Sequence, residues 1–158
     1  MSSLPSGTVT FLFTDVEGST RLWEQQPKAM QPALARHDVL LRDTIEQSGG
    51  VVFKTVGDAF CAAFATAPDA LGASLSAQRA LRVEAWVDVE ASLRVRMALH
   101  TGMAEQRHGD YFGSTLNRVA RLLSAGHGGQ VLLSRTAYDL VRDHLPAGAV
   151  EPVEAGSA

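Results

Sequence analysis

The chain has 158 residues, of which 46% are hydrophobic and 20% charged, and its formal net charge at pH 7 is −3. This composition predicts one globular domain with one hydrophobic core and excludes an intrinsically disordered chain. The charge offers no basic excess for nucleic acid or anionic lipid, and no apolar run approaches the roughly 20 residues of a membrane span. A single cysteine, Cys61, excludes an intramolecular disulfide and suits a reducing compartment, so we expect a cytoplasmic protein.

The N-terminal third predicts a buried strand and then helical structure. Residues 8–14 are β-branched and aromatic, which favours a strand, and Asp15 follows at its end. The small residues at 18–20 indicate a tight turn into a helix. Over 28–47 apolar residues recur at steps of three and four, which predicts an amphipathic helix that ends at the glycines 49–50.

The middle of the chain predicts a hairpin and a second long helix. Residues 51–56 and 59–64 have the composition of short strands, and the two-residue link 57–58 between them is typical of a tight β-hairpin. Thr66 begins a capping-box pattern, which predicts a helix over about 67–85.

The remaining elements alternate between strand and helix. In residues 93–100 large apolar side chains alternate with polar or small ones, which predicts a strand with one buried face. Residues 114–124 have a helical pattern, and 130–133 form a short strand. Ser134 is placed to cap a last helix that runs to about His144.

This order of elements predicts an α+β fold, with a mixed sheet on which helices pack. A βαββαβ core is followed by a further helix, strand and helix. We expect one domain over residues 7–145, an N-terminal tail at 1–6, and a C-terminal tail or truncated linker at 146–158, where no periodicity occurs.

The first cluster of candidate functional residues lies where the first predicted strand ends. Asp15 is followed by Val16, Glu17 and the small residues Gly18, Ser19 and Thr20. Free N–H groups at a helix start attract phosphate, and a neighbouring carboxylate can hold Mg²⁺, which prefers oxygen ligands. The alternative is that Asp15 only caps the helix.

The second cluster surrounds the predicted hairpin. Asp58 lies at its tip, where it is a candidate metal ligand or an ordinary turn residue. Lys54 lies inside an apolar strand, where a positive charge is unusual. Its alternative role is that of a solvated edge-strand lysine, which discourages aggregation.

The third cluster runs from Gly109 to Arg121. Asn117 and Arg121 are four residues apart in the predicted helix, so they project from one face, and Arg is well suited to bind a phosphoryl group. The alternative is that Asn117 and Arg121 only form part of a solvated polar face of the helix. The opposite, apolar stripe is expected to contain Leu116, Val119, Ala120 and Leu123.

Three other side chains are weaker candidates. His37 lies on an apolar helical stripe, so we expect it packed in a core or a subunit interface. His100 is expected to bond the backbone, and Cys61 is expected to be buried and inert. The sequence has no metal-binding Cys/His spacing, nucleophile elbow or Walker loop.

In this order and spacing, four motifs resemble the class III adenylate and guanylate cyclase catalytic domains, in a bacterial subgroup with a short arm. They are FTDVEGST at 13–20, FKTVGDAF at 53–60, LHTG at 99–102 and DYFGSTLNRVAR at 110–121. The resemblance covers about residues 7–145 and implies a ferredoxin-like α+β core.

The resemblance also implies a metal centre and a phosphate site. Asp15 and Asp58 match the two metal-binding aspartates, and Val16 would add a backbone carbonyl. Two Mg²⁺ or Mn²⁺ ions are implied, with the turn at 18–20 beside the substrate phosphates.

Four further matches imply the substrate and the catalytic pair. Lys54 and Asp110 match the pair that reads the adenine edge, and guanylate-specific relatives often carry Glu in place of the lysine, so Lys54 favours ATP. Asn117 matches the residue that orients the ribose, and Arg121 the residue that stabilises charge on the reacting phosphate.

The implied activity is conversion of ATP to 3′,5′-cyclic AMP and pyrophosphate at two sites of a head-to-tail homodimer. The aspartates of one subunit would meet Lys54, Asp110, Asn117 and Arg121 of the other. The alternatives are a guanylate cyclase and a nucleotide-binding regulatory module with little or no turnover. Fusion to regulatory domains in a longer protein is compatible with each of these functions.

Two features depart from the family pattern. The stretch from Gly102 to Asp110 is short, where many members have a longer arm that reaches over the partner. Members usually continue past the last helix into a β-hairpin with a basic residue for the triphosphate, whereas this sequence ends at Ala158, so we expect that hairpin to be absent.

Overall fold

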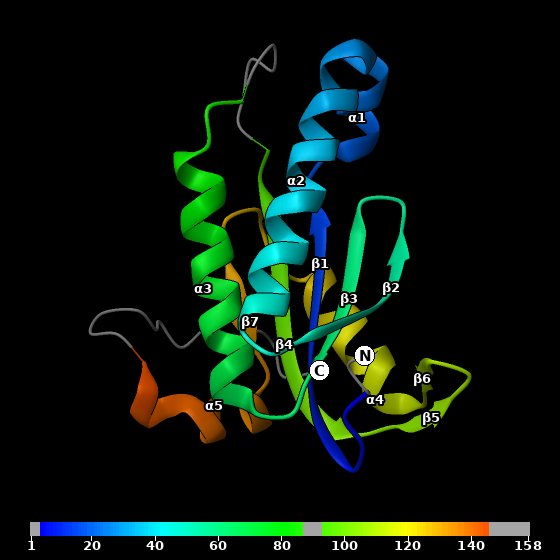
Figure 1. Ribbon diagram of the computed structural model, residues 1–158, viewed down its shortest axis with the longest axis vertical. Helices are drawn as coiled ribbons and strands as arrows, with labels where there is room; N and C mark the ends of the chain where they lie inside the picture. Colours follow the sequence, from blue (N-terminus) through cyan, green and yellow to red (C-terminus); the bar gives the residue numbers. More distant parts are fainter. Residues whose placement is uncertain (1–3, 87–92, 146–158) are drawn as a thin grey trace.

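A five-stranded sheet with helices on both faces forms the centre of the molecule (Figure 1), in a computed structural model that describes residues 4–86 and 93–145. The elements in chain order are β1 (Thr8–Val16), α1 (Ser19–Gln25), α2 (Pro27–Gln47), β2 (Val51–Val56), β3 (Ala59–Phe64), α3 (Ala67–Val83), β4 (Val95–Met103), β5 (Glu105–Arg107), β6 (Asp110–Phe112), α4 (Ser114–Ser124), β7 (Val131–Leu133), α5 (Arg135–Val141) and the 3₁₀-helix η1 (Arg142–His144).

The order of the strands confirms the expected α+β fold. The sheet runs β2-β3-β1-β4-β7, and neighbouring strands are antiparallel except for the parallel pair β4 and β7. The first four of these strands, with the helices that connect them, make the βαββαβ core, and β7 extends the sheet beyond β4. The order places the end of β1 between the β2–β3 turn and β4, which positions the site described below.

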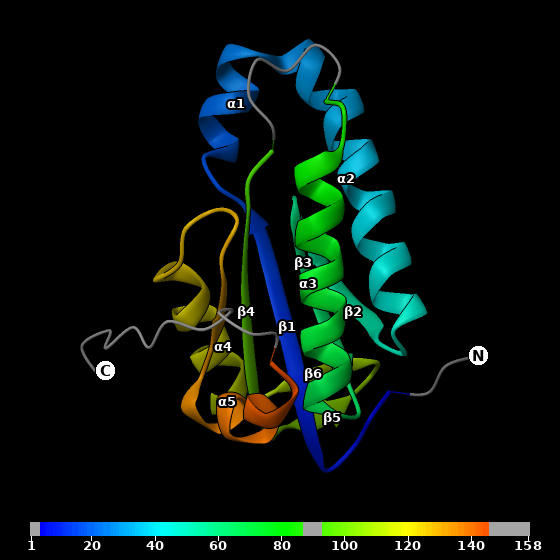
Figure 2. The same ribbon diagram turned by 90° about the vertical axis from the view of Figure 1, so that its left-hand side faces the viewer.

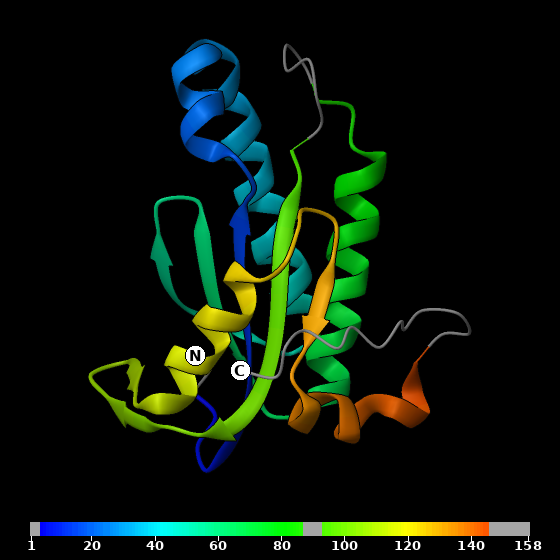
Figure 3. The ribbon, with the colours of Figure 1, turned by 180° about the vertical axis from the view of Figure 1, so that it is seen from behind.

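The helices cover both faces of the sheet. α2 and α3 lie on one face (Figures 1 and 2), where the larger core includes Leu12, Leu41 and Leu99. α4 lies on the other face, as the view from behind shows (Figure 3), and a second core there includes Phe11 and Val119. Burial of apolar surface on two sides holds the central strands rigidly in place.

The strand predicted at 93–100 differs from expectation in its burial. We expected one buried face, but Ala98 and His100 on the other face are also buried. The prediction of one solvated face is wrong because α4 packs on that side of β4. A strand covered on both faces has no need of strict apolar–polar alternation.

Local signals predicted several boundaries correctly. The strands at 51–56 and 59–64 and the helix at 114–124 have the predicted ends, while α3 stops at Val83 rather than near 85. The backbone N–H of Asp69 donates to Thr66 Oγ1 at 3.3 Å, and that of Ala137 donates to Ser134 Oγ at 3.2 Å. Both predicted caps are therefore confirmed.

The short arm contains a hairpin that was not predicted. β5 and β6 pair antiparallel, and the two residues between them, His108 and Gly109, have φ angles of 52° and 75°. Positive φ at both positions is the geometry of the tightest hairpin turns. The arm of this chain is thus a two-stranded projection beside α4 (Figure 3).

The predicted C-terminal tail at 146–158 lies outside the described residues, as does the start of the N-terminal tail at 1–3. Within the described ranges, no helix combines the length and apolar character needed to cross a membrane.

Candidate active site

The carboxylate of Asp15 forms a two-point ion pair with Arg96. The residues lie directly opposite each other where β1 pairs with β4. Arg96 Nε lies 2.7 Å from Asp15 Oδ1 and Nη2 lies 2.5 Å from Oδ2. This hydrogen bonding raises the pKa of the Arg96 guanidinium, and the charges of Asp15, Glu17 and Asp58 add to the effect. Asp15 is therefore the carboxylate that Arg96 contacts, while Glu17 and Asp58 act on its charge through space.

The simplest alternative for Asp15, a helix cap, is wrong. The N-cap of α1 is Gly18, which has a left-handed φ of 69° and makes no side-chain cap bond. Because Asp15 is still within β1, its side chain projects from the sheet toward Arg96 rather than toward the helix. The residues Gly18, Ser19 and Thr20 follow at the start of α1, half-buried or exposed.

Asp58 reaches the end of β1 from the turn between β2 and β3. Its Oδ1 accepts a hydrogen bond from the backbone N–H of Val16 at 3.0 Å. Gly57, with a φ of 57°, supplies the left-handed conformation that the tight turn needs. Asp58 is therefore more than an ordinary turn residue, because it ties the turn to the strand that carries Asp15.

The chemistry of these groups suits a hard divalent cation. Asp15 and Asp58 supply carboxylate oxygens near the end of β1, and Val16, which follows Asp15 and bonds Asp58 through its N–H, has a backbone carbonyl to offer. Within residues 4–86 and 93–145, no three His, Cys, Asp or Glu side chains gather as a metal-binding group. A metal here would therefore complete its shell with water and phosphate, as Mg²⁺ commonly does.

Glu17 was not predicted as a site residue, but it ties the same turn to a second loop. Its backbone N–H donates to Arg94 O at 2.8 Å, and its Oε2 accepts from the backbone N–H of Gly128 at 3.1 Å. His127 Nδ1 lies 3.8 Å from the same oxygen. The glycine-rich loop before β7 thereby supports the residue next to Val16.

Lys54 and Asp110 lie together in one chain, in spite of their separation in sequence. Lys54 Nζ is 3.5 Å from Asp110 Oδ2, and Asp110 Oδ1 accepts from the backbone N–H of Tyr111 at 2.7 Å. The Lys54 side chain is 50% exposed and that of Asp110 is 25% exposed. A cation and an anion are thus side by side and open to solvent.

An aromatic cluster brings this pair together. The rings of Phe53 and Tyr111 meet edge to face with centroids 4.8 Å apart, and each also packs against Phe11 of β1. Such pairs add about 0.5–1.5 kcal/mol to their burial. The register of β2 shifts between Val52 and Lys54, so an irregularity at Phe53 accompanies this packing. Lys54 follows Phe53 in the chain and Asp110 precedes Tyr111, so the packing of the two rings places the candidate pair side by side.

Asn117 and Arg121 project from the solvent-facing side of α4. Both are exposed, while Thr115, Val119 and Leu123 bury the opposite side of the helix. The apolar stripe differs slightly from the prediction, because Ala120 is exposed and Leu122 is partly buried instead. The two polar residues therefore share a face that their own chain leaves open.

The weaker candidates have structural surroundings. His37 is buried, with Nδ1 2.8 Å from Asp38 Oδ1 and its ring edge-on to Phe60. His100 Nδ1 lies 2.7 Å from Ser134 Oγ, so the expected backbone bond is wrong, and burial lowers its pKa. Cys61 is partly buried rather than buried, and desolvation raises its pKa to about 11, so the thiol stays protonated and inert.

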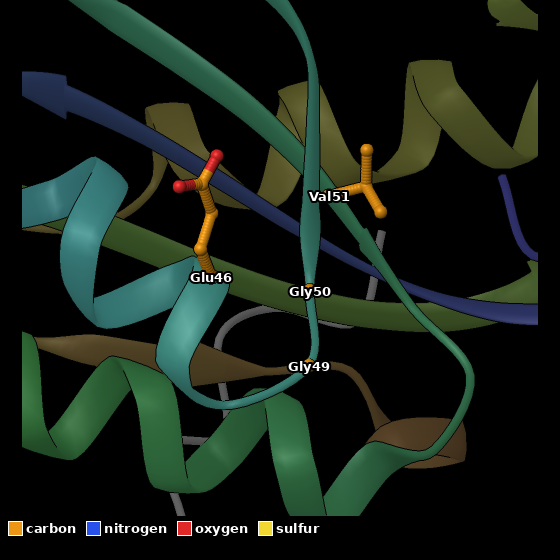
Figure 4. Close-up of a pocket in the computed structure, with 4 residues that line it drawn as sticks. All are labelled: Glu46, Gly49, Gly50 and Val51. Atoms are coloured by element: carbon orange, nitrogen blue, oxygen red, sulfur yellow. The ribbon is translucent and has the colours of Figure 1, made fainter. Parts of the chain in front are cut away.

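A surface hollow at the end of α2 is lined by none of the candidate residues. Figure 4 shows that it is lined by Glu46, Gly49, Gly50 and Val51. It offers one carboxylate and no cation or nucleophile. A second hollow is lined by Arg42 and residues 52–55 and lies along the edge strand β2, beside Lys54. Of the candidate residues, only Lys54 therefore lines one of these two hollows.

Comparison with known proteins gives consistent matches. The sequence matches the family described as adenylate and guanylate cyclase catalytic domain over residues 1–154. An uncharacterized protein of Mycobacterium tuberculosis is 44% identical over 147 residues, which cover 92% of this chain and 49% of that protein. An adenylate cyclase of Schizosaccharomyces pombe is 33% identical over 156 residues, which cover 84% of this chain and 9% of that enzyme.

A solved structure agrees with these matches. One described as adenylate cyclases from Trypanosoma brucei in their monomeric state has a TM-score of 0.81 and 31% identity, covering 87% of this chain and 78% of that one. The chain spans about half the length of the mycobacterial relative and less than a tenth of the fungal enzyme.

Proposed function

Because this chain belongs to the family of adenylate and guanylate cyclase catalytic domains, we propose that it converts ATP to 3′,5′-cyclic AMP and pyrophosphate in intracellular signalling. The observation that carries the proposal is that Asp58 is bonded to the N–H of Val16, the residue that follows Asp15 at the end of β1. Two divalent ions, Mg²⁺ or Mn²⁺, would be held there by these carboxylates and the Val16 carbonyl. When bound, such ions lower the pKa of an attacking hydroxyl and neutralise a triphosphate.

The reaction needs an in-line displacement at the α-phosphorus. A bond forms from the ribose O3′ to the α-phosphorus, and the bond from that phosphorus to the bridging oxygen breaks. Pyrophosphate leaves, and the hydroxyl proton passes to water. Asn117 would orient the ribose from α4. Arg121 would donate to the phosphate oxygens, whose charge grows in the transition state, because its planar fork suits a phosphoryl group. The backbone N–H groups at 18–20 would face the other phosphates.

The Lys54–Asp110 pair supports adenine as the base. Adenine presents an amino group at C6 and an acceptor at N1, so Asp110 would accept from the amino group and Lys54 would donate to N1. Guanine presents an acceptor at C6 and an N–H at N1. Asp110 would then face an acceptor and Lys54 would face a donor, so neither hydrogen bond could form. A polar pair left unmatched in this way rejects the wrong base.

We further propose that two copies of the chain share each site, in a head-to-tail dimer. The face of α4 that carries Asn117 and Arg121 supports this, because both residues are exposed and so open to a second copy. The metal carboxylates of one subunit would meet the adenine pair and the α4 pair of the other. The catalytic unit would occupy residues 7–145 and act in the cytoplasm, where ATP is available.

A direct assay tests the proposal. Purified chain is incubated with ATP or GTP and Mn²⁺ or Mg²⁺, and cyclic products are separated by chromatography. We expect cyclic AMP from ATP and much less cyclic GMP from GTP. A higher kcat/KM for GTP would instead indicate a guanylate cyclase. Nucleotide binding by calorimetry without any cyclic product would indicate a regulatory module.

A further inference from the structure

Arg96 occupies both oxygens of Asp15, a carboxylate that the proposed function needs as a metal ligand. The guanidinium approaches edge-on, with its Nε and Nη2 on different oxygens at 2.7 and 2.5 Å. The two side chains are only 27% and 22% exposed, so water competes weakly for them. Two parallel, charge-assisted bonds of this kind are among the stronger polar contacts in proteins.

We propose that Arg96 is the resident counter-ion of the metal centre, which neutralises Asp15 while no metal is bound and must release it when a metal binds. This inference rests on the proposed function, since it takes Asp15 as a metal ligand. Arg96 would be a positioning residue in this role, because it acts on the metal through Asp15.

The local charges explain why a counter-ion is needed. Arg96 binds both oxygens of Asp15, Glu17 follows Asp15 by two residues, and Asp58 accepts from Val16 N–H at the end of the same strand. Without a cation, partly buried negative charges at the end of one strand would repel one another. A divalent ion and the guanidinium both neutralise the same oxygens, so each weakens the binding of the other. The pair therefore stabilises the metal-free fold and lowers the affinity for the metal.

Two single variants separate this role from a general charge effect. Arg96→Gln removes the ion pair, and Arg94→Gln removes the same charge from an exposed neighbour two residues away. Binding of Mn²⁺ in the absence of nucleotide is followed by the loss of the free-ion signal in electron paramagnetic resonance. We expect Arg96→Gln to lower the Kd for Mn²⁺ roughly tenfold, which corresponds to about 1.4 kcal/mol, and Arg94→Gln to change it much less.

A thermal measurement gives a second readout. Without metal, Arg96→Gln should have a lower Tm than the unaltered chain, and saturating Mn²⁺ should raise its Tm by a larger amount than it raises that of the unaltered chain. If Arg96→Gln does not fold, Arg96→Lys replaces it, since lysine cannot span both oxygens. An equal or higher Kd for Mn²⁺ in the Arg96 variant would overturn the proposal, because it would mean that Arg96 does not compete with the metal.

Asp58→Asn distinguishes failure of this inference from failure of the proposed function. If Mn²⁺ binds the unaltered chain and Asp58→Asn weakens that binding, the metal site stands and only the Arg96 comparison decides the inference. If Mn²⁺ binding is unaffected by Asp58→Asn, the ion binds elsewhere, and both the metal site and the counter-ion role are rejected.

Discussion

Lys54 Nζ and Asp110 Oδ2 lie 3.5 Å apart at the junction of the edge strand β2 and the short arm strand β6. Packed rings of the neighbouring residues, Phe53 and Tyr111, fix this relationship. The spacing of a cation and an anion on a rigid support is what a base-reading site requires, since small displacements would lose the match. The proposed preference for ATP depends on this pair.

Replacement of Lys54 by Glu should weaken the preference for ATP over GTP. Glutamate cannot donate to N1 of adenine, and it would repel Asp110. Since an unmatched polar pair costs up to about 10⁴ in discrimination, we expect the ratio of kcat/KM for ATP to that for GTP to fall by roughly a hundredfold or more. Lys28→Glu, an equal charge change at an exposed position of α2, is the control. An unchanged ratio in Lys54→Glu would contradict the assignment.

Asp58→Asn should abolish metal-dependent turnover and leave the fold intact. Asparagine keeps an Oδ1 that accepts the Val16 N–H, but it removes the charge that would hold a divalent ion. A metal supplies several kcal/mol of charge stabilisation, so we expect kcat to fall about a thousandfold or more, with a Tm close to that of the unaltered chain. Asp43→Asn, exposed on α2, should keep its activity. Activity near normal in Asp58→Asn would remove Asp58 from the metal centre.

Arg121→Ala should lower kcat more than it raises KM. The charge that Arg121 would neutralise develops mainly in the transition state. Loss of one such donor typically costs about 10²–10³ in rate. Arg118→Ala removes an equal charge from the same helix and should have a small effect. A change confined to KM would instead assign Arg121 to ground-state binding of ATP.

Gly128→Ala should destabilise the fold, while Gly72→Ala should stabilise it. A Cβ at residue 128 would lie 2.4 Å from the Cβ of Arg94 and 3.0 Å from Glu17 Oε1. We expect the free energy of unfolding to fall by about 1–3 kcal/mol. Residue 72 lies within α3 with no atom inside 4 Å of its added Cβ, so alanine should gain about 0.5–1 kcal/mol. Urea denaturation measures both, and a stable Gly128→Ala would show that the loop at Glu17 is adaptable.

Local signals in the sequence predicted most of the elements and the positions of the candidate residues. A two-residue turn, a serine cap and helical periodicity are decided by neighbours in the chain, so 57–58, Ser134 and 114–124 were predicted with the observed boundaries. The ion pair of Asp15 with Arg96 was not predicted, because it depends on the register between β1 and β4. A shift of one residue in that register would place Arg96 on the opposite face.

Two other differences have a similar cause. The hairpin of β5 and β6 has three-residue strands, and its turn at His108 lacks the Asn-Gly or Asp-Gly signal of common tight turns. Burial of Ala98 depends on which face α4 covers, which local alternation does not reveal. The roles of Asn117, Arg121 and the metal carboxylates remain predictions, because they concern groups outside a single chain.

The shared site is the central claim, and mixing two inactive variants tests it most directly. Asp58→Asn and Arg121→Ala proteins should each be nearly inactive alone. In a mixed dimer one site carries both lesions and the other carries neither. With free exchange, half of the dimers are mixed and half of their sites work, so activity should recover to roughly a quarter of that of the unaltered protein. The measurement is cyclic AMP formation by the mixture at high protein concentration, with ATP and Mn²⁺ present.

Mass spectrometry under native conditions establishes that mixed dimers have formed. Recovery near a quarter would support sites built from the Asp58 of one subunit and the Arg121 of the other. No recovery, with mixed dimers present in the expected proportion, would contradict the account, because each protein would then keep its own lesion within a site made by one chain.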